Sequence, residues 1–206
     1  MSESVPPATS VIEWGWAGSA LEDPSGDLHV VVEREHGALV ALLDGLGHGL
    51  EAAQSVQMAV PVIEAHAGAS VALLVRQCHE ALYRTRGAVM SVAWFDAHDA
   101  SMTWTGVGNV DCILIRSGAN PAPRKEAIAT RGGVVGYRLP PLREQRYAVS
   151  RGDVLVMATD GIQNAFSAGI ITQFSAQEIA ESILIRYAKG TDDAHVLVAR
   201  YLGAHP

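Results

Sequence analysis

Residues 42–49 read LLDGLGHG, so that an apolar segment runs into an aspartate, three glycines and the start of a helical pattern. Glycine readily adopts positive φ and lets the main chain approach a bound ion closely. An aspartate at the end of a strand offers the hard oxygen ligands that Mg²⁺ and Mn²⁺ prefer. Asp44 is therefore the first candidate metal ligand in the chain.

The same design occurs three more times. An apolar segment delivers an acid followed by glycine in VLVMATDG at 154–161, an acid pair precedes an apolar segment in TDDAHVLV at 191–198, and SGDL occupies 25–28. One such motif alone is usually a turn, because Asp and Gly favour turns for local reasons. Four of them at strand boundaries of one modest domain instead indicate a shared, oxygen-rich site for hard cations.

The first half of the chain predicts three strands and two helices. Short apolar segments separated by Pro, Gly and acidic residues predict strands at 11–18, 27–34 and 38–43. Apolar residues at helical spacing then predict a helix from Gly49 through Ile63, interrupted by Pro61, and a second helix over 71–82 with Ser70 as its N-cap.

The second half predicts mainly strands. We expect an antiparallel meander of consecutive hairpins or near-hairpins at 88–95, 101–107 and 110–116. Residues 117–142 are rich in Pro, Gly and Arg and predict loops with one short strand near Ala127. Further patterns predict strands at 143–149 and 153–159, a helix at 175–189 and a last strand at 194–201.

This order of elements predicts the fold class. Strand groups separated by helices do not alternate as in a parallel α/β fold, so we expect an α+β sandwich with one core. Neither a repeat nor a linker divides the sequence. We expect a flexible N-terminus at 1–10 and a single catalytic domain at 11–203.

Composition excludes several classes of protein. The chain has 206 residues, 49% of them hydrophobic, and a formal net charge of −7, so neither nucleic acid nor an anionic membrane surface is an expected partner. Only Cys78 and Cys112 are present, which argues against a disulfide framework or a structural zinc site. No signal segment or membrane-length apolar run occurs, so we expect a cytoplasmic protein.

Four motifs in a fixed order resemble one enzyme family. DGLGHG at 44–49, GVGNV at 106–110, ATDGI at 158–162 and TDDAHVLVAR at 191–200 are similar to the PPM family of metal-dependent, type 2C-like protein phosphatases. The pairing of SGD at 25–27 with the DG of 44–45 resembles its bacterial SpoIIE-like branch. The resemblance extends from about residue 13 to residue 201. It implies a four-layer αββα sandwich, in which helices flank two antiparallel β-sheets.

The resemblance also implies a site for two divalent cations, Mn²⁺ or Mg²⁺. Asp44 would bridge the two cations and the Gly45 carbonyl would bind one of them. Asp160 and Asp192 would hold the other cation, with Asp193 as the reserve for Asp192. Asp27 would lie beside the first cation, and Asp23 is a weaker substitute for it.

The implied reaction is hydrolysis of phosphoserine or phosphothreonine by a hydroxide that bridges the two cations. Leu46 stands where many relatives carry a histidine proposed as general acid, and His48 is read first as a loop-to-helix residue and second as a proton donor. Several relatives place a phosphate-binding arginine ahead of the first acidic motif, but no arginine precedes Asp27. Asn109 could contact substrate or simply form part of a turn.

The partners implied by the resemblance are phosphoproteins of bacterial stress signalling. The first motif begins close to the start of the chain, as in a free-standing phosphatase, so the expected substrates are phosphorylated STAS-domain proteins of a stressosome. One alternative is a phosphatase of a phosphorylated anti-sigma-factor antagonist, which would use the same site. Another is a catalytically weak module that only binds phosphoproteins, although the four acids it would have lost are all present.

Overall fold

Alternating apolar positions build two five-stranded antiparallel sheets in the computed structural model, which describes residues 10–118 and 125–204. One sheet has the order β2 (Asp27–Arg34), β3 (Gly37–Gly45), β4 (Ala88–Asp96), β5 (Ser101–Val107) and β8 (Gln145–Ala148). The other has the order β1 (Ile12–Ser19), β10 (Ala194–Tyr201), β9 (Val154–Ala158), β6 (Asp111–Ile115) and β7 (Lys125–Ile128).

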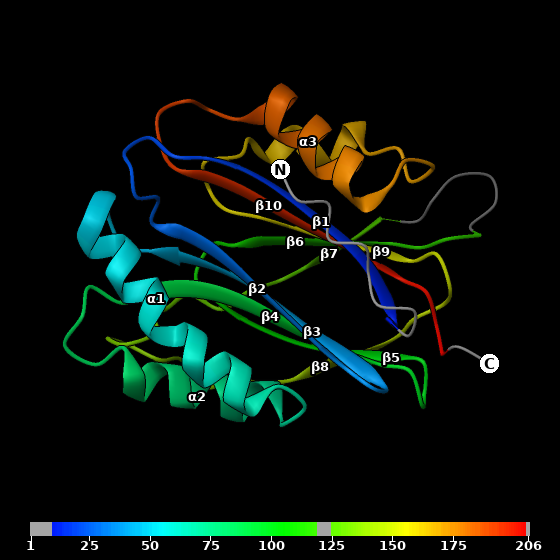
Figure 1. Cartoon of the computed structure of the whole chain (residues 1–206), viewed down its shortest axis with the longest axis horizontal. Helices are drawn as coiled ribbons and strands as arrows, with labels where there is room; N and C mark the ends of the chain where they lie inside the picture. Colours follow the sequence, from blue (N-terminus) through cyan, green and yellow to red (C-terminus); the bar gives the residue numbers. More distant parts are fainter. Residues whose placement is uncertain (1–9, 119–124, 205–206) are drawn as a thin grey trace.

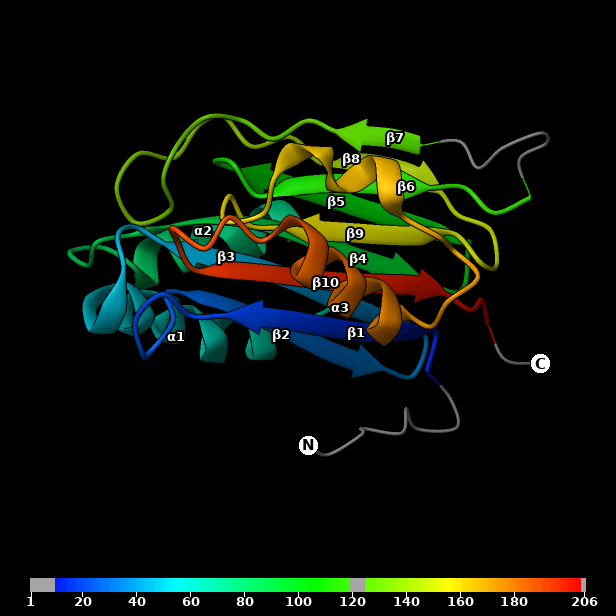
Figure 2. The same cartoon turned by 90° about the horizontal axis from the view of Figure 1, so that it is seen from above.

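Helices cover the outer face of each sheet. The first sheet is covered by α1 (Gly49–His66) and α2 (Val71–Ala81), and the second by α3 (Ala176–Tyr187) with the short 3₁₀ helix η1 (Asn164–Gly169), as Figure 1 shows. From above, α3 lies over β1 and β10 (Figure 2). The predicted α+β fold with four αββα layers is confirmed.

Strand periodicity decides which side chains enter which layer of the core. In β3, Leu42 packs between the two sheets with residues such as Trp104 and Leu197, whereas the neighbouring Leu43 packs under α1 and α2. A third cluster joins β9 and β10 to α3 through side chains such as Ile179. Burying one large apolar side chain contributes about 1.5–3 kcal/mol. The interior therefore fixes the positions of the strand ends that carry the acids.

The helix ends follow the predicted signals. Ser70 is the N-cap of α2, where its hydroxyl accepts a hydrogen bond from the backbone N–H of Leu73 at 3.2 Å. Ser175 and Glu178 form a capping box at the start of α3. The first helix continues through Pro61 to His66. Within the described residues, no helix is both long and apolar enough to span a membrane.

The predicted meander is wrong in its last step. The hairpin between β4 and β5 forms, but β5 and β6 belong to different sheets, so residues 108–110 cross from one sheet to the other. Residues 149–153 make a similar crossing between β8 and β9. Local turn residues do not reveal which sheet the next strand joins, since long-range packing decides it.

The short helix η1 was not predicted, and residues 1–9 of the expected flexible N-terminus lie outside the described part of the chain.

The packing of α3 against β1 gives a first testable prediction. A Cβ at Gly15 would lie 2.4 Å from both the backbone N and Cα of Gln177, so Gly15→Ala must push α3 away from the sheet. We expect it to destabilise the fold by about 1–3 kcal/mol, as overpacking does, and to lower Tm by about 3–10 °C in thermal unfolding. Gly132→Ala is the control, because nothing lies within 4 Å of the added Cβ. An unchanged Tm for Gly15→Ala would show that this contact is not close.

Candidate active site

Two of the predicted acids face each other across neighbouring strands. Asp27 begins β2 and pairs in register with Asp44 near the end of β3. Directly opposite residues of an antiparallel pair point to the same face, with Cβ atoms about 4.5–5.5 Å apart. Leu42, two residues before Asp44, lies in the core between the sheets. Both carboxylates therefore point towards the second sheet.

Residues of the second sheet reach this pair through Thr159, which follows β9. The Thr159 hydroxyl donates a hydrogen bond to Asp27 Oδ2 at 2.7 Å, and it accepts one from the backbone N–H of His195 at 2.8 Å. All three residues are far apart in the sequence and Thr159 is buried. This link between the sheets brings the next residue, Asp160, to the same end of the molecule.

Two acids at this end, Asp27 and Asp44, have a raised pKa. Burial raises the pKa of Asp27 to about 7, against the lowering effect of the Thr159 hydrogen bond, and the charges of Asp193, Asp160 and Asp192 add to the rise. Burial also raises the pKa of Asp44 to about 8, followed by the charge of Asp27 and then those of the same three acids. Negative charges that are buried together are costly unless a cation compensates them.

The donor set fits hard divalent cations. Carboxylate oxygens from four strand ends interact electrostatically, and no hydrogen bond within the described residues engages the Asp44 carboxylate. In the same part of the chain, no three Asp, Glu, His or Cys side chains converge as a preformed cation site. The oxygen chemistry and the shared location fit Mg²⁺ or Mn²⁺, and the ligand roles remain predictions.

The two acids of the pair 192–193 lie in different environments. Asp193 is buried, and its two carboxylate oxygens accept backbone N–H groups of Leu21 at 2.7 Å and of Gly26 at 2.6 Å. Asp192 is exposed and, among the described residues, accepts only the N–H of Asp193, at 2.9 Å. Asp193 thus fastens the loop that leads into Asp27. Asp192 keeps oxygens free for a cation, which supports its place ahead of Asp193.

This division predicts opposite outcomes for two matched substitutions. Asp193→Asn puts an amide NH₂ group against backbone donors, so we expect a loss of about 1–3 kcal/mol of unfolding free energy. Asp192→Asn should leave stability within about 0.5 kcal/mol, as most exposed substitutions do. Denaturant unfolding without added metal measures both. Equal stability of the two variants would contradict the fastening role of Asp193.

The glycine-rich loop after β3 passes tightly under α1. Gly45 is buried, its N–H donates to the Gly26 carbonyl at 3.0 Å, and a Cβ there would lie 2.5 Å from the Ala52 carbonyl oxygen. Only glycine fits at this position. The Gly45 carbonyl remains the predicted cation ligand.

His48, further along the loop, is the N-cap residue of α1, and its Nδ1 lies 3.0 Å from Glu22 Oε2 on the exposed surface.

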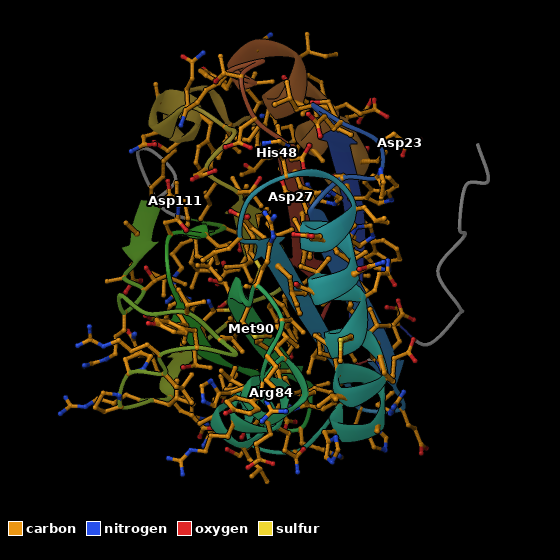
Figure 3. All side chains as sticks on the ribbon, turned by 90° about the vertical axis from the view of Figure 1, so that its left-hand side faces the viewer. Asp23, Asp27, His48, Arg84, Met90 and Asp111 are labelled. Atoms are coloured by element: carbon orange, nitrogen blue, oxygen red, sulfur yellow. The ribbon has the colours of Figure 1, made fainter. Side chains whose placement is uncertain are left out.

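The crossing at 106–110 brings Asn109 to the site. Its side-chain amide donates to Asp160 Oδ2 at 2.8 Å, so Asn109 orients a candidate ligand. The Thr130 hydroxyl donates to the Gly108 carbonyl at 2.6 Å and fixes the turn, where φ of Gly108 is 98°. The contact of Asn109 with substrate stays a prediction. Figure 3 looks onto this end of the molecule, with Asp27 near the middle and His48 above it.

Sequence reasoning missed four residues near the site. Thr159 joins the sheets, and Lys189 donates through Nζ to the Asp160 carbonyl. Asp111 begins β6, and burial raises its pKa, with Lys189 lowering and Asp160 raising it. The guanidinium of Arg86 lies against Gly47. The TDG motif was a signal for Thr159, whereas nothing local marks the other three.

Known proteins match both the sequence and the fold. The family model described as Stage II sporulation protein E (SpoIIE) matches residues 34–202. Phosphoserine phosphatase RsbX from Bacillus subtilis (strain 168) is 23% identical over 137 residues, covering 66% of this chain and 67% of the relative.

Two solved structures share the fold over nearly their whole length. A chain from a study of the bacterial stressosome, a modular system adapted to control secondary messenger signaling, has a TM-score of 0.81 at 27% identity, covering 92% of this chain and 99% of its own. RsbX in complex with magnesium has a TM-score of 0.82 at 20% identity, with 95% and 97% covered. The family match spans well over half of the chain. The chain therefore belongs to the SpoIIE family of PP2C-type protein serine/threonine phosphatases.

Proposed function

We propose that this phosphatase acts on phosphorylated STAS-domain proteins of a stressosome, through a single catalytic domain at 11–203 that holds two Mn²⁺ or Mg²⁺ ions. The observation that carries the metal-dependent reaction is the facing pair of Asp27 and Asp44, joined by Thr159 to the end of β9. The substrate class is supported by the similarity to RsbX and to a chain from the stressosome study. The same proposal includes a cytoplasmic location for the phosphatase.

The cations would be held by Asp27, Asp44, the Gly45 carbonyl, Asp160 and Asp192. When bound there, divalent cations lower the pKa of water and neutralise phosphoryl oxygens.

The remaining residues of the site position these ligands. Thr159 holds one oxygen of Asp27 and leaves the other available, because only Oδ2 accepts its hydroxyl. Asn109 fixes the side chain of Asp160, while Lys189 binds the carbonyl of the same residue. Asp193 holds the loop that precedes Asp27. Ligands held by such contacts need little reorganisation when substrate binds.

The alternative substrate is a phosphorylated anti-sigma-factor antagonist of the RsbU or SpoIIE type, hydrolysed at the same site. Purified protein with Mn²⁺ is given each phosphoprotein at matched concentration, and phosphate release yields kcat/KM for both. We expect kcat/KM to be at least about tenfold higher for the stressosome protein, a difference of about 1.4 kcal/mol in transition-state binding. A preference for the antagonist would transfer the assignment to the alternative. Tight binding of both without hydrolysis would indicate a module that only binds phosphoproteins.

A further inference from the structure

A groove borders the candidate active site and has no role in the reaction described so far. It encloses about 440 Å³ between α1 and the loop that follows α2. Its lining includes Glu51, Gln54 and Met58 from the helix and Arg84, Thr85 and Arg86 from the loop. Met58 is 48% exposed, so the groove offers apolar surface beside two cations.

One end of the groove touches the glycine-rich loop of the site. A Cβ built on Gly47 would lie only 2.5 Å from Arg86 Nη1, so the guanidinium rests directly on residue 47. The same guanidinium forms an ion pair with Glu51 in the first turn of α1. Arg86 therefore links the groove along α1 to the glycine-rich loop that follows Asp44.

Arg84, in the other part of the groove, has an unusual backbone conformation. Its φ is 69°, in the left-handed region that disfavours a residue with a Cβ, and such positions gather at functional sites. The Arg84 guanidinium lies 5.5 Å from the ring centre of Tyr83, which is 65% exposed. Figure 3 shows Arg84 in the lower half of the view onto this end of the molecule, below Asp27.

We propose that this groove binds the segment of the phosphoprotein substrate adjoining the phosphorylated residue, and that Arg84 and Arg86 select acidic side chains there. The occupant follows from charge, because Arg84 and Arg86 outnumber Glu51, the acid in the lining, so the groove is positive on a chain with a net charge of −7. It follows also from continuity, since a chain whose phosphate is at the acids can extend past Gly47 into the groove. The proposal rests on the proposed phosphatase function and adds a specificity determinant to it.

Binding of labelled peptides tests the groove without catalysis. The probe is a fluorescein-labelled peptide with a central phosphoserine and three flanking Asp residues, and its counterpart carries Asn in their place. Fluorescence anisotropy in excess chelator removes the cation contribution. We expect the wild-type protein to bind the Asp peptide at least about fivefold more tightly, because each exposed charge pair contributes modestly.

Four substitutions separate the groove from general effects of charge. Arg84→Glu should remove the preference for the Asp peptide, whereas Arg186→Glu makes the same charge change on α3 and should keep it. Arg84→Gly suits the positive φ, so it should lower the preference without lowering Tm. Glu51→Gln frees Arg86 from its ion pair and should strengthen binding of the Asp peptide about twofold.

Two results would overturn the proposal: equal binding of the two peptides by the wild-type protein, or an Arg84→Glu variant that keeps the full preference. With Mn²⁺ restored, the ratio of kcat/KM for the Asp peptide to that for p-nitrophenyl phosphate should fall in Arg84→Glu and stay constant in Arg186→Glu. Absence of Mn²⁺-dependent phosphate release from wild-type protein would count against the proposed function instead. Failure of the groove and failure of the phosphatase are thus distinguishable.

Discussion

Asp44→Asn is expected to reduce phosphate release by about 10³-fold or more while the protein stays folded. The charges of the other acids of the site all act on Asp44, and no hydrogen bond within the described residues occupies its carboxylate. An amide at this position carries no charge to offset a cation, and one cation contributes several kcal/mol to stabilising a phosphoryl transition state. Phosphate release from p-nitrophenyl phosphate with Mn²⁺ measures the loss, and circular dichroism checks the fold.

The control for Asp44→Asn is a carboxylate far from the site. Asp99 lies in the turn between β4 and β5 and pairs with Arg146 at the surface. Asp99→Asn should keep turnover within about twofold, because surface ion pairs contribute little. Tm of Asp44→Asn without metal should not fall, since the substitution removes a carboxylate whose ionisation burial and then the charge of Asp27 disfavour. A folded Asp44→Asn protein with normal turnover would refute the assignment of Asp44 to the reaction.

The elements with clear periodicity were predictable because their residues alternate between two buried layers. The observed bounds of β2 at 27–34, β5 at 101–107 and β10 at 194–201 equal those predicted. The same alternation places Asp44 on the face between the sheets, two residues after Leu42. The acids could be identified because each follows or precedes such a strand.

Contacts between distant segments could not be predicted from local patterns. The turn at 108–110 has the glycine and asparagine of a hairpin, yet Asn109 donates to Asp160 on the other sheet. Asp193 resembles Asp192 in sequence, and the fold distinguishes them by burying Asp193 against two N–H groups of the loop at 21–26. Arg86 has no motif of its own, because its neighbour Gly47 lies 39 positions earlier in the chain.

Removal of divalent cations is expected to abolish activity, and their return should also stabilise the fold. Burial, and then the charges of neighbouring acids, raise the pKa of Asp27 and Asp44, and a bound cation would offset both effects, so it would stabilise the folded chain that brings these acids together. At a concentration 100 times Kd, binding adds about 2.7 kcal/mol to the unfolding free energy. For a domain of this size, that corresponds to a rise in Tm of about 5–10 °C. Thermal unfolding in chelator, then with excess Mn²⁺ or Mg²⁺, measures the rise.

The comparison with Asp44→Asn makes this result specific to the site. A variant without the central carboxylate should show a much smaller rise in Tm, whereas Asp99→Asn should match the wild-type protein, because its carboxylate belongs to a surface turn. Phosphate release should return in the same cation range as the rise in Tm, since one set of ligands serves both. Full activity in excess chelator, or an equal Tm rise in Asp44→Asn, would place the reaction or the cations elsewhere. The strand ends that carry Asp27, Asp44 and Asp160 would then lack the role that their shared location at one end of the molecule assigns to them.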